Sequence, residues 1–321
     1  MRTVSSIRLL SPLILFTLCA AIPAHAESLA IDDDLGRTHV FPKPPRRIVS
    51  ISPGLTETLF ALGLDDAVVG VSDFCDFPEA ARARPKVGGV SPNLEVIVGL
   101  RPDLVLGTGG IGMREFAARM DRLGIPALGF EPTSIDAVFE RILRLGKITD
   151  RQAQAQELVV RLRRRLDAVT SRRPTGSPPR VLYLVDEDPY ITVGRGSFLY
   201  DVLIKAGARP FDGGTTAYPR IGMEAIVGFD PEVIFFADDT PDGGERRLPA
   251  WRRWNVISAV RSGRLYAIPR GLVNRPGPRI IDAVEVIDSK LKAQHDLLVP
   301  SHPPFEKGGQ GGISQPGDSL P

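Results

Sequence analysis

The chain has few of the residues that build disulfide frameworks and transition-metal sites. It contains 2 cysteines and 4 histidines in 321 residues. Cys19 lies in an apolar N-terminal stretch, so only Cys75 would remain once that stretch is removed, and no intramolecular disulfide could form. His25 and His302 lie near the two ends of the chain, which leaves too few histidines for a transition-metal cage. We therefore expect no resident metal and no cofactor.

Long apolar runs are also absent, except at the N-terminus. Arg2 and Arg8 accompany the apolar stretch 9–22, and Ala24-His25-Ala26 places small residues at the two positions that a signal peptidase reads. This order predicts a signal peptide over residues 1–26, cleaved after Ala26. It also predicts export from the cytoplasm, to the periplasm.

The two ends of the chain carry one alternative and one further expectation. A lipoprotein signal would use Cys19, but Leu18 stands before it, where lipid attachment needs a small residue. At the other end, Pro300–Pro321 is rich in Gly, Pro and Ser, a composition that predicts a disordered tail.

An excess of charge of either sign is missing as well. The chain has 40 Lys and Arg against 38 Asp and Glu, a formal net charge of +2. Both surplus positive charges, Arg2 and Arg8, leave with the signal peptide, so the mature chain is near neutral. Such a balance gives no electrostatic basis for binding nucleic acid or an anionic membrane surface.

What the chain does contain is an internal repeat. Residues 94–106, LEVIVGLRPDLVL, and residues 223–235, MEAIVGFDPEVIF, are identical at five of thirteen positions. Each copy predicts a short amphipathic helix that ends at a Gly, turns at a Pro and enters a buried strand. Similar strands, 47–51 and 180–184, open the two halves. The repeat predicts two α/β lobes of the same kind, although unrelated α/β units that share a pattern are the alternative.

One long helix joins the halves. Residues 149–171 contain no Gly or Pro, and Leu158, Leu162, Leu166 and Val169 form a single apolar stripe. We expect Thr149 or Asp150 to cap its N-terminus. The domain organisation that follows is an N-terminal lobe over 27–148, a rigid backbone helix over 149–173 and a C-terminal lobe over 174–299.

The fold class is therefore α/β, with two Rossmann-like lobes, parallel central sheets and a ligand cleft between them. Strands that alternate with helices predict parallel sheets covered on both faces. Ligands bind to such sheets beyond the carboxyl ends of the strands. This rule predicts that five loops surround the cleft: 52–54, 74–77, 108–110, 186–194 and 270–278.

The loops do not carry the signature of an enzyme. Neither a G-x-S-x-G elbow nor a P-loop occurs, and the glycine-rich stretch Gly107–Gly112 has the wrong spacing for a dinucleotide site. Aromatic and lightly polar residues stand there instead, which suits a large, flat, partly apolar ligand. We interpret the chain as a solute receptor, with an exported α/β enzyme as the alternative from another class.

For several of these residues, packing in the protein core is the alternative to contact with a ligand. Phe74 is as well explained by core packing as by ligand contact. Cys75 fits a small buried hydrophobic residue better than a ligand. Trp251 and Trp254, three residues apart on a predicted helix, fit packing within the lobe. Tyr218 precedes a Pro in a loop, where core packing is less favoured.

Five segments occur in an order that resembles one family. They are RIVSISPGLTETLFALG (47–63), GVSDFCDFP (70–78), NLE (93–95), RPDLV (101–105) and GRLY (263–266). They resemble periplasmic binding proteins for cobalamin and iron–siderophore uptake, and the cobalamin-binding branch most closely. The resemblance covers about residues 46–297. It implies a monomeric receptor that delivers its ligand to an ABC importer, a permease dimer with its ATPase subunits.

The resemblance also implies which residues bind. Tyr218, Phe74 and Arg275 fall at matching cleft positions, whereas Gly89 and Thr108 stand where cobalamin-binding members place bulky aromatics. A corrinoid is the expected ligand, and an iron–siderophore or haem is the alternative. The expected ligand-binding residues are Pro53, Gly54, Phe74, Gly89, Thr108, Tyr190, Tyr218, Asn274 and Arg275.

Two acidic residues occupy the same position in the two repeats. Glu95 and Glu224 each open a short helix, where a carboxylate stabilises the positive helix end by a few tenths of a kcal/mol, about the size of a surface charge effect. The resemblance implies a second role, in which one Glu on each lobe docks onto basic residues of the permease dimer.

Overall fold

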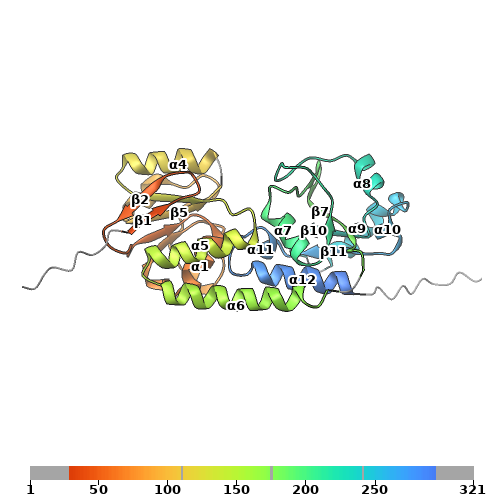
Figure 1. Ribbon diagram of the computed structural model, residues 1–321. Coiled ribbons are helices and arrows are strands. Elements are labelled where there is room, and N and C mark those ends of the chain that lie inside the picture. Colours follow the sequence, from red (N-terminus) through yellow and green to blue (C-terminus); the bar gives the residue numbers. More distant parts are fainter. Residues whose placement is uncertain (1–28, 110, 174–175, 241, 294–321) are drawn as a thin grey trace, which may run out of the picture.

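Two α/β lobes lie side by side, joined along one side by helix α6 (Gln152–Thr170), as Figure 1 shows. The computed structural model describes residues 29–109, 111–173, 176–240 and 242–293. The expected signal peptide, Cys19 and the C-terminal tail lie outside these residues. In the described part of the chain, the helices are too short or too polar to cross a membrane.

The N-terminal lobe is built on a parallel sheet with the strand order β4-β3-β5-β6. Helices α1 and α5 cover one face of this sheet, and α3 and α4 cover the other. Buried aliphatic residues in every strand explain why both faces need a helical layer. The strands are β3 (Ile48–Ser50), β4 (Val68–Val71), β5 (Leu104–Thr108) and β6 (Ala127–Phe130), and the helices are α1 (Pro53–Ala61), η1 (Asp65–Ala67), α2 (Glu79–Arg82), α3 (Leu94–Gly99), α4 (Ile111–Arg122) and α5 (Ile135–Ile148).

A hairpin precedes this lobe. Strands β1 (Leu29–Asp32) and β2 (Thr38–Phe41) pair antiparallel around a turn in which Gly36 has φ 78°, a conformation that favours glycine. From the sequence we expect a turn over 32–37 and a short edge strand at Val40-Phe41, and both are present, whereas β1 was not expected.

The C-terminal lobe has the strand order β11-β10-β7-β8, with β9 also paired to β7. The sheet is parallel except for β8, which runs antiparallel to β7 and occupies part of the segment that we expected to be a loop. From the sequence we expect one helix over 249–258, but the chain there forms the end of α9, η2 and the first residue of α10. The elements are β7 (Arg180–Glu187), β8 (Tyr190–Thr192), α7 (Phe198–Lys205), β9 (Arg209–Pro210), α8 (Met223–Phe229), β10 (Val233–Ala237), α9 (Gly243–Trp251), η2 (Arg252–Trp254), α10 (Ser258–Arg261), β11 (Leu265–Ile268), α11 (Arg270–Val273) and α12 (Ile280–Lys292).

The internal repeat is a structural repeat. After α3 and α8, Arg101 and Asp230 adopt nearly the same left-handed backbone conformation, with φ 49° and 48°. In both lobes an arginine at the start of a central strand, Arg47 just before β3 and Arg180 as the first residue of β7, donates to the carbonyl of this residue. Arg47 Nε lies 3.0 Å from the Arg101 oxygen, and Arg180 Nε lies 2.7 Å from the Asp230 oxygen.

Helix α6 begins later than the sequence suggested. Thr149 ends α5, where its hydroxyl donates to the carbonyl of Leu145 at 2.7 Å, and Asp150 turns the chain with φ 58°. Arg151 is the N-cap residue, so neither Thr149 nor Asp150 caps α6. Helices α5 and α6 approach each other closely at Gly146 and Ala155, where a Cβ added to Gly146 would overlap the Ala155 Cβ.

A single apolar cluster extends from the first lobe through α6 into the second. It contains residues of α1 and α5 on one side, the buried stripe of α6, and residues of α7 and α12 on the other. Arg165 of α6 adds ion pairs to Asp282 and Glu285 of α12, at 2.7 and 2.6 Å. The carboxylate of Asp201 on α7 accepts the backbone N–H of Ile135, at the start of α5, at 2.8 Å.

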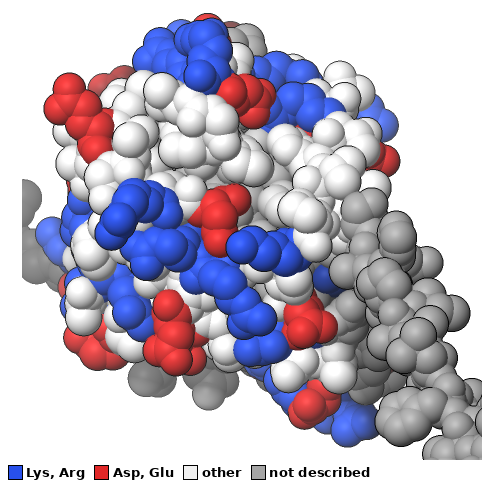
Figure 2. Space-filling view, turned by 90° about the vertical axis from the view of Figure 1, so that its left-hand side faces the viewer, with Lys and Arg blue, Asp and Glu red and all other residues white. Residues whose placement is uncertain are grey.

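Charges of both signs are mixed on the end of the N-terminal lobe that faces away from the C-terminal lobe. Figure 2 shows Lys and Arg side chains gathered there, with Asp and Glu side chains among them. Ion pairs such as Arg37–Asp121, at 3.0 Å, belong to this lobe. Among the described residues of this end, acidic side chains therefore stand next to the basic ones, which weakens the attraction for a polyanion.

The stripe of α6 gives the first testable prediction. Replacing the buried Leu162 with Ala should lower the free energy of unfolding by about 2–5 kcal/mol, since it leaves a cavity where α6 meets the lobes. Val160, 55% exposed on the same helix, is the matched control, and Val160→Ala should change stability by less than about 0.5 kcal/mol. Urea unfolding measures both. Equal, small effects would mean that α6 does not pack as described.

Candidate ligand-binding site

The N-terminal lobe carries a cavity of about 390 Å³ at the carboxyl end of its sheet. The loop after β3, the end of β5 and the loop after α2 meet there. This placement agrees with the rule for parallel sheets. The cavity brings together four of the predicted residues: Pro53, Phe74, Gly89 and Thr108.

The cavity wall around Phe74 is formed largely by apolar residues. Phe74 is 50% exposed, and the edge of its ring lies beside Gly89, where an added Cβ would come within 3.3 Å of the Phe74 Cζ atom. Thr108 adds a hydroxyl that donates to the Ser52 hydroxyl at 2.9 Å. Glycine at position 89 thus leaves one face of an aromatic ring open to a ligand.

A buried polar cluster fixes the loop that carries Phe74. The Cys75 sulfur lies 3.1 Å from the Thr56 hydroxyl and 3.2 Å from the Ser72 hydroxyl. Thr56 in turn donates to Ser50 at 2.8 Å. Cys75 is buried beneath the loop, in keeping with the interpretation as a small core residue.

The predicted residues of the C-terminal lobe separate into different surroundings. Tyr218 is 46% exposed in the loop between β9 and α8, and partial burial raises the pKa of its hydroxyl. Tyr190 is half-buried. Its ring packs against Trp251, with centroids 5.9 Å apart, and lies against the apolar cluster of that lobe. Trp251 itself is buried, as the packing interpretation of the sequence predicted.

Gly54 also differs from the expected position on the ligand wall. It is buried where α1 meets the segment between α11 and α12. An added Cβ would overlap the carbonyl oxygen of Pro276, and Gly277 lies on the same side. Glycine is required at position 54 because two backbones approach each other between the lobes.

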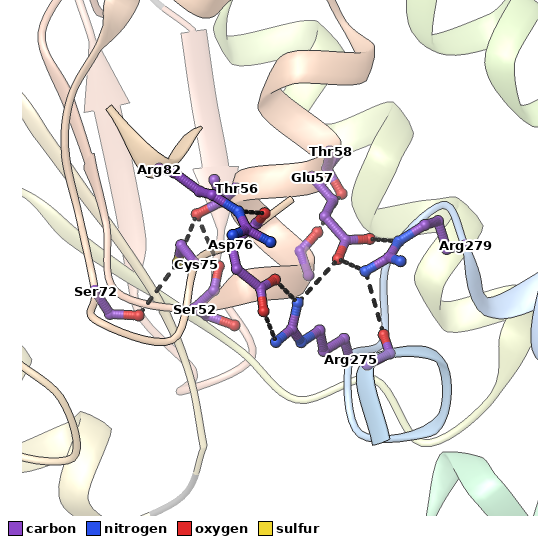
Figure 3. Close-up of polar contacts among 12 residues, drawn as sticks. Ser52, Thr56, Glu57, Thr58, Ser72, Cys75, Asp76, Arg82, Arg275 and Arg279 are labelled. Carbon is purple, nitrogen blue, oxygen red and sulfur yellow. Dashed lines mark hydrogen bonds and ion pairs between the residues drawn. The ribbon is translucent and has the colours of Figure 1, made fainter. Parts of the chain in front are cut away.

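The same segment brings two arginines onto the N-terminal lobe, as Figure 3 shows. Arg275 forms a two-pronged ion pair with Asp76, in which Nη2 lies 3.0 Å from Oδ2. Arg279 holds Glu57 through contacts of 2.6 and 3.0 Å. Asn274, the neighbour of Arg275, is exposed at the end of α11. We call the contact of residues 274–279 with α1 and with the loop that carries Asp76 the lobe junction.

Burial and pairing act differently on the charged groups of the lobe junction. Burial raises the pKa of Glu57, and the hydrogen bond from Arg279 offsets only part of this effect. The hydrogen bond from Arg275 lowers the pKa of Asp76. Complete burial lowers the pKa of Arg141, which donates to the carbonyl of Pro276, to about 10.

The sequence did not single out Glu57, Asp76 or Arg279. Asp76 lies in the GVSDFCDFP segment and Glu57 in the RIVSISPGLTETLFALG segment, so both were within the family resemblance. Their partners come from the other end of the chain, 199 and 222 positions away. No local pattern reveals such pairs.

Phe77, expected in the same cleft, lines a different cavity of about 310 Å³ with Phe60 and Ala61 of α1. The guanidinium of Arg279 lies 4.0 Å from the centre of the Phe77 ring. Phe74 and Phe77 therefore serve different surfaces, although three positions separate them.

The two acidic residues proposed for docking are exposed at matching places. Glu95 and Glu224 are each the second residue of their helix, α3 and α8. Both helices cover the sheet face turned away from α6. Asn93 already accepts the backbone N–H of Glu95, at 3.0 Å, so α3 has a cap without the Glu95 side chain.

Within the described ranges, no group of three or more His, Cys, Asp or Glu residues could hold a metal ion. His39, a histidine of that part of the chain, lies 3.4 Å from Asp33 in the β1–β2 hairpin.

Known proteins share this architecture. Residues 48–271 match the sequence model of a family described as periplasmic binding protein. The vitamin B12-binding protein of Vibrio cholerae is 30% identical over 255 residues, which cover 78% of this chain and 91% of that protein.

Two solved structures are similar over most of their length. The crystal structure of the periplasmic vitamin B12-binding protein BtuF of Vibrio cholerae has a TM-score of 0.68 at 29% identity, covering 78% of this chain and 98% of that one. The periplasmic haem-binding protein BhuT, in complex with two haems, has a TM-score of 0.69 at 28% identity, covering 76% and 97%.

The close approach at the lobe junction gives the second prediction. Gly54→Ala should lower the free energy of unfolding by about 1–3 kcal/mol, because the new methyl group forces two backbones apart. Gly99 at the end of α3 is the control, since a Cβ there meets no atom within 4 Å. Chemical denaturation compares the two variants. A stable Gly54→Ala protein would show that the lobes are not in contact at this point.

Proposed function

This chain belongs to the periplasmic binding protein family, and on that premise we propose that it binds a corrinoid and delivers it to an ABC importer. One observation carries the proposal. The half-exposed Phe74 ring lies beside Gly89 at the carboxyl end of a parallel sheet, in a cavity of about 390 Å³.

The shape of that wall suits a large planar molecule. Aromatic rings stack on flat ligands in offset geometry, and a glycine beside the ring adds no side chain in front of it. Tyr218, from the other lobe, supplies a second exposed aromatic ring with a polar end. The amides around a corrin ring could use that hydroxyl and the hydroxyl of Thr108 as hydrogen-bonding partners.

Haem is the second candidate, because BhuT is a haem-binding protein of similar structure. Partial burial raises the pKa of Tyr218, which favours a neutral phenol that hydrogen-bonds to an amide over a phenolate that binds iron. An iron–siderophore is a further alternative. Among these ligands we favour the corrinoid.

An exported α/β enzyme is the alternative from a different class. The hydroxyls in the cavity, Ser52 and Thr108, bond to each other. His39, the histidine placed by the structure, lies in the hairpin beside Asp33 and not in the cavity. A pair of nucleophile and base is therefore not assembled from the described cavity residues.

The remaining parts of the proposal concern location and partners. We propose export to the periplasm with cleavage after Ala26, and a monomeric receptor. Its partner is a permease dimer with ATPase subunits, on which Glu95 and Glu224 dock, one from each lobe.

Ligand titration tests the proposed function. Tryptophan fluorescence should show saturable binding of cyanocobalamin and dicyanocobinamide and weaker binding of haem and ferric siderophores. Phe74→Ala should weaken corrinoid binding by about 1–3 kcal/mol, or roughly 5- to 150-fold, because a stacking surface is lost. Tyr218→Ala should act in the same direction.

Phe77→Ala is the matched control, since it removes an exposed ring from the same loop but from a different cavity. Its effect on binding should be small. Chemical turnover of a ligand without saturable binding would rule out a receptor. Equal losses for Phe74→Ala and Phe77→Ala would move the site away from the cavity.

Docking requires a separate measurement in a reconstituted importer. The double reversal Glu95→Lys/Glu224→Lys should leave ligand affinity intact but abolish uptake and stimulation of the importer's ATPase, since basic permease residues would then face like charges. The double reversal Glu140→Lys/Glu157→Lys changes the net charge equally, on α5 and α6, and should transport normally. Normal uptake by the first variant would reduce Glu95 and Glu224 to residues that stabilise helix ends.

A further inference from the structure

We propose that Asp76 positions Arg275 and thereby selects ligands by charge. Because the Asp76 carboxylate is already paired with the Arg275 guanidinium in the cleft, ligands that carry carboxylates are disfavoured and ligands that carry amides are favoured. This inference rests on the proposed function, because it assigns a specificity role within the same cleft. It reassigns Arg275, which the sequence suggested as a direct partner of ligand groups, to a residue that is already paired.

The ion pair is geometrically complete. Arg275 meets both carboxylate oxygens of Asp76 with its two terminal nitrogens, as Figure 3 shows, and Glu57 Oε1 lies 3.9 Å from Nη1. The Arg275 side chain is 17% exposed and that of Asp76 is 49% exposed. A guanidinium recognises carboxylates through this two-pronged arrangement, so Asp76 takes the place that a ligand carboxylate would need.

The loop that carries Asp76 also carries Phe74, two positions earlier. The buried contacts of Cys75, the residue between them, with Thr56 and Ser72 hold that loop in place. The stacking surface and the ion pair are therefore fixed relative to each other. The edge of a ligand that stacks on Phe74 is therefore within reach of the loop that carries Asp76.

The other guanidiniums of the lobe junction are not free to replace Arg275. Arg279 is occupied by Glu57 and by the Phe77 ring. Arg141 is fully buried beneath the junction. On the C-terminal lobe, Asp186 and Glu187 line a small cavity together with Arg247 and Arg270, so positive charge is again accompanied by carboxylates.

The energetic consequence follows from Coulomb's law. A carboxylate brought to Arg275 would also lie near the Asp76 and Glu57 carboxylates, whose repulsion offsets the attraction of the guanidinium. A primary amide meets no such repulsion. Its N–H groups can donate to the outer lone pairs of Asp76, while its carbonyl accepts from the remaining N–H groups of Arg275.

The experiment compares two ligands that share one macrocycle and differ by one charge. Cyanocobalamin carries amides, and its monocarboxylic acid derivatives carry a propionate in place of one propionamide. Calorimetric titration gives the affinity ratio of amide to acid. In the intact protein the amide form should bind at least about tenfold more tightly, and in Asp76→Asn this preference should fall about tenfold, because Arg275 becomes available to the propionate.

Two further variants identify the cause. Glu79→Gln removes an exposed carboxylate three positions later, on α2, and its ratio should equal that of the intact protein. In an Arg275→Gln background, Asp76→Asn should change the ratio much less than in the intact protein, because the guanidinium is gone and only the direct repulsion between Asp76 and the propionate is then removed. Asp76→Ser repeats the test if the Asn variant folds poorly.

The outcomes separate this inference from the proposed function. A ratio that does not change in Asp76→Asn, or that changes equally in Glu79→Gln, overturns the role of Asp76, even if cobalamin binds well. If the protein binds haem and no corrinoid, the proposed function fails. The ratio is then measured with iron protoporphyrin and its dimethyl ester, and the same shift in Asp76→Asn still supports the role of Asp76.

Discussion

The packing of α6 against both lobes is the contact on which the remaining structure depends. One apolar cluster passes from α1 and α5 through α6 into α7 and α12, so the lobes share a core. The lobe junction adds a second contact, at Gly54 and Pro276, and Asp201 adds a third, at the start of α5. Separating or rotating the lobes would expose apolar surface and break buried ion pairs. The spacing across the cleft is therefore set before any ligand arrives.

A cleft of fixed spacing changes what recognition requires. Binding energy need not close the lobes, so complementarity depends on the walls as they stand. On the N-terminal lobe the wall is an aromatic ring beside a glycine, held by the buried Cys75 cluster. At the lobe junction Arg275 and Arg279 are already paired with Asp76 and Glu57. Such a site favours a rigid, flat ligand with neutral polar groups at its edge, which describes a corrinoid better than a haem with two carboxylates.

Much of the fold was predictable from the sequence because local patterns determine it. Helix 94–99, the buried strand that follows it, the two similar lobes and the long helix follow from periodicity, Gly and Pro positions and the repeat. The start of α6 was not predictable, since the left-handed turn at Asp150 interrupts a sequence pattern that indicates a continuous helix. The contacts of individual side chains were also less predictable than the fold. Tyr190 packs on Trp251, Gly54 lies against Pro276, and Arg275 pairs with Asp76, because each depends on a partner that only the folded chain brings near.

Small-angle X-ray scattering of the mature chain, with and without saturating cyanocobalamin, tests the shared core most directly. A continuous helix and a packed lobe junction resist hinge motion, so we predict nearly the same radius of gyration and distance distribution in both states, with a rotation between lobes of at most about 10°. A large compaction on binding would contradict the account. It would show that the lobes move as separate bodies and that α6 and the lobe junction do not set the width of the cleft.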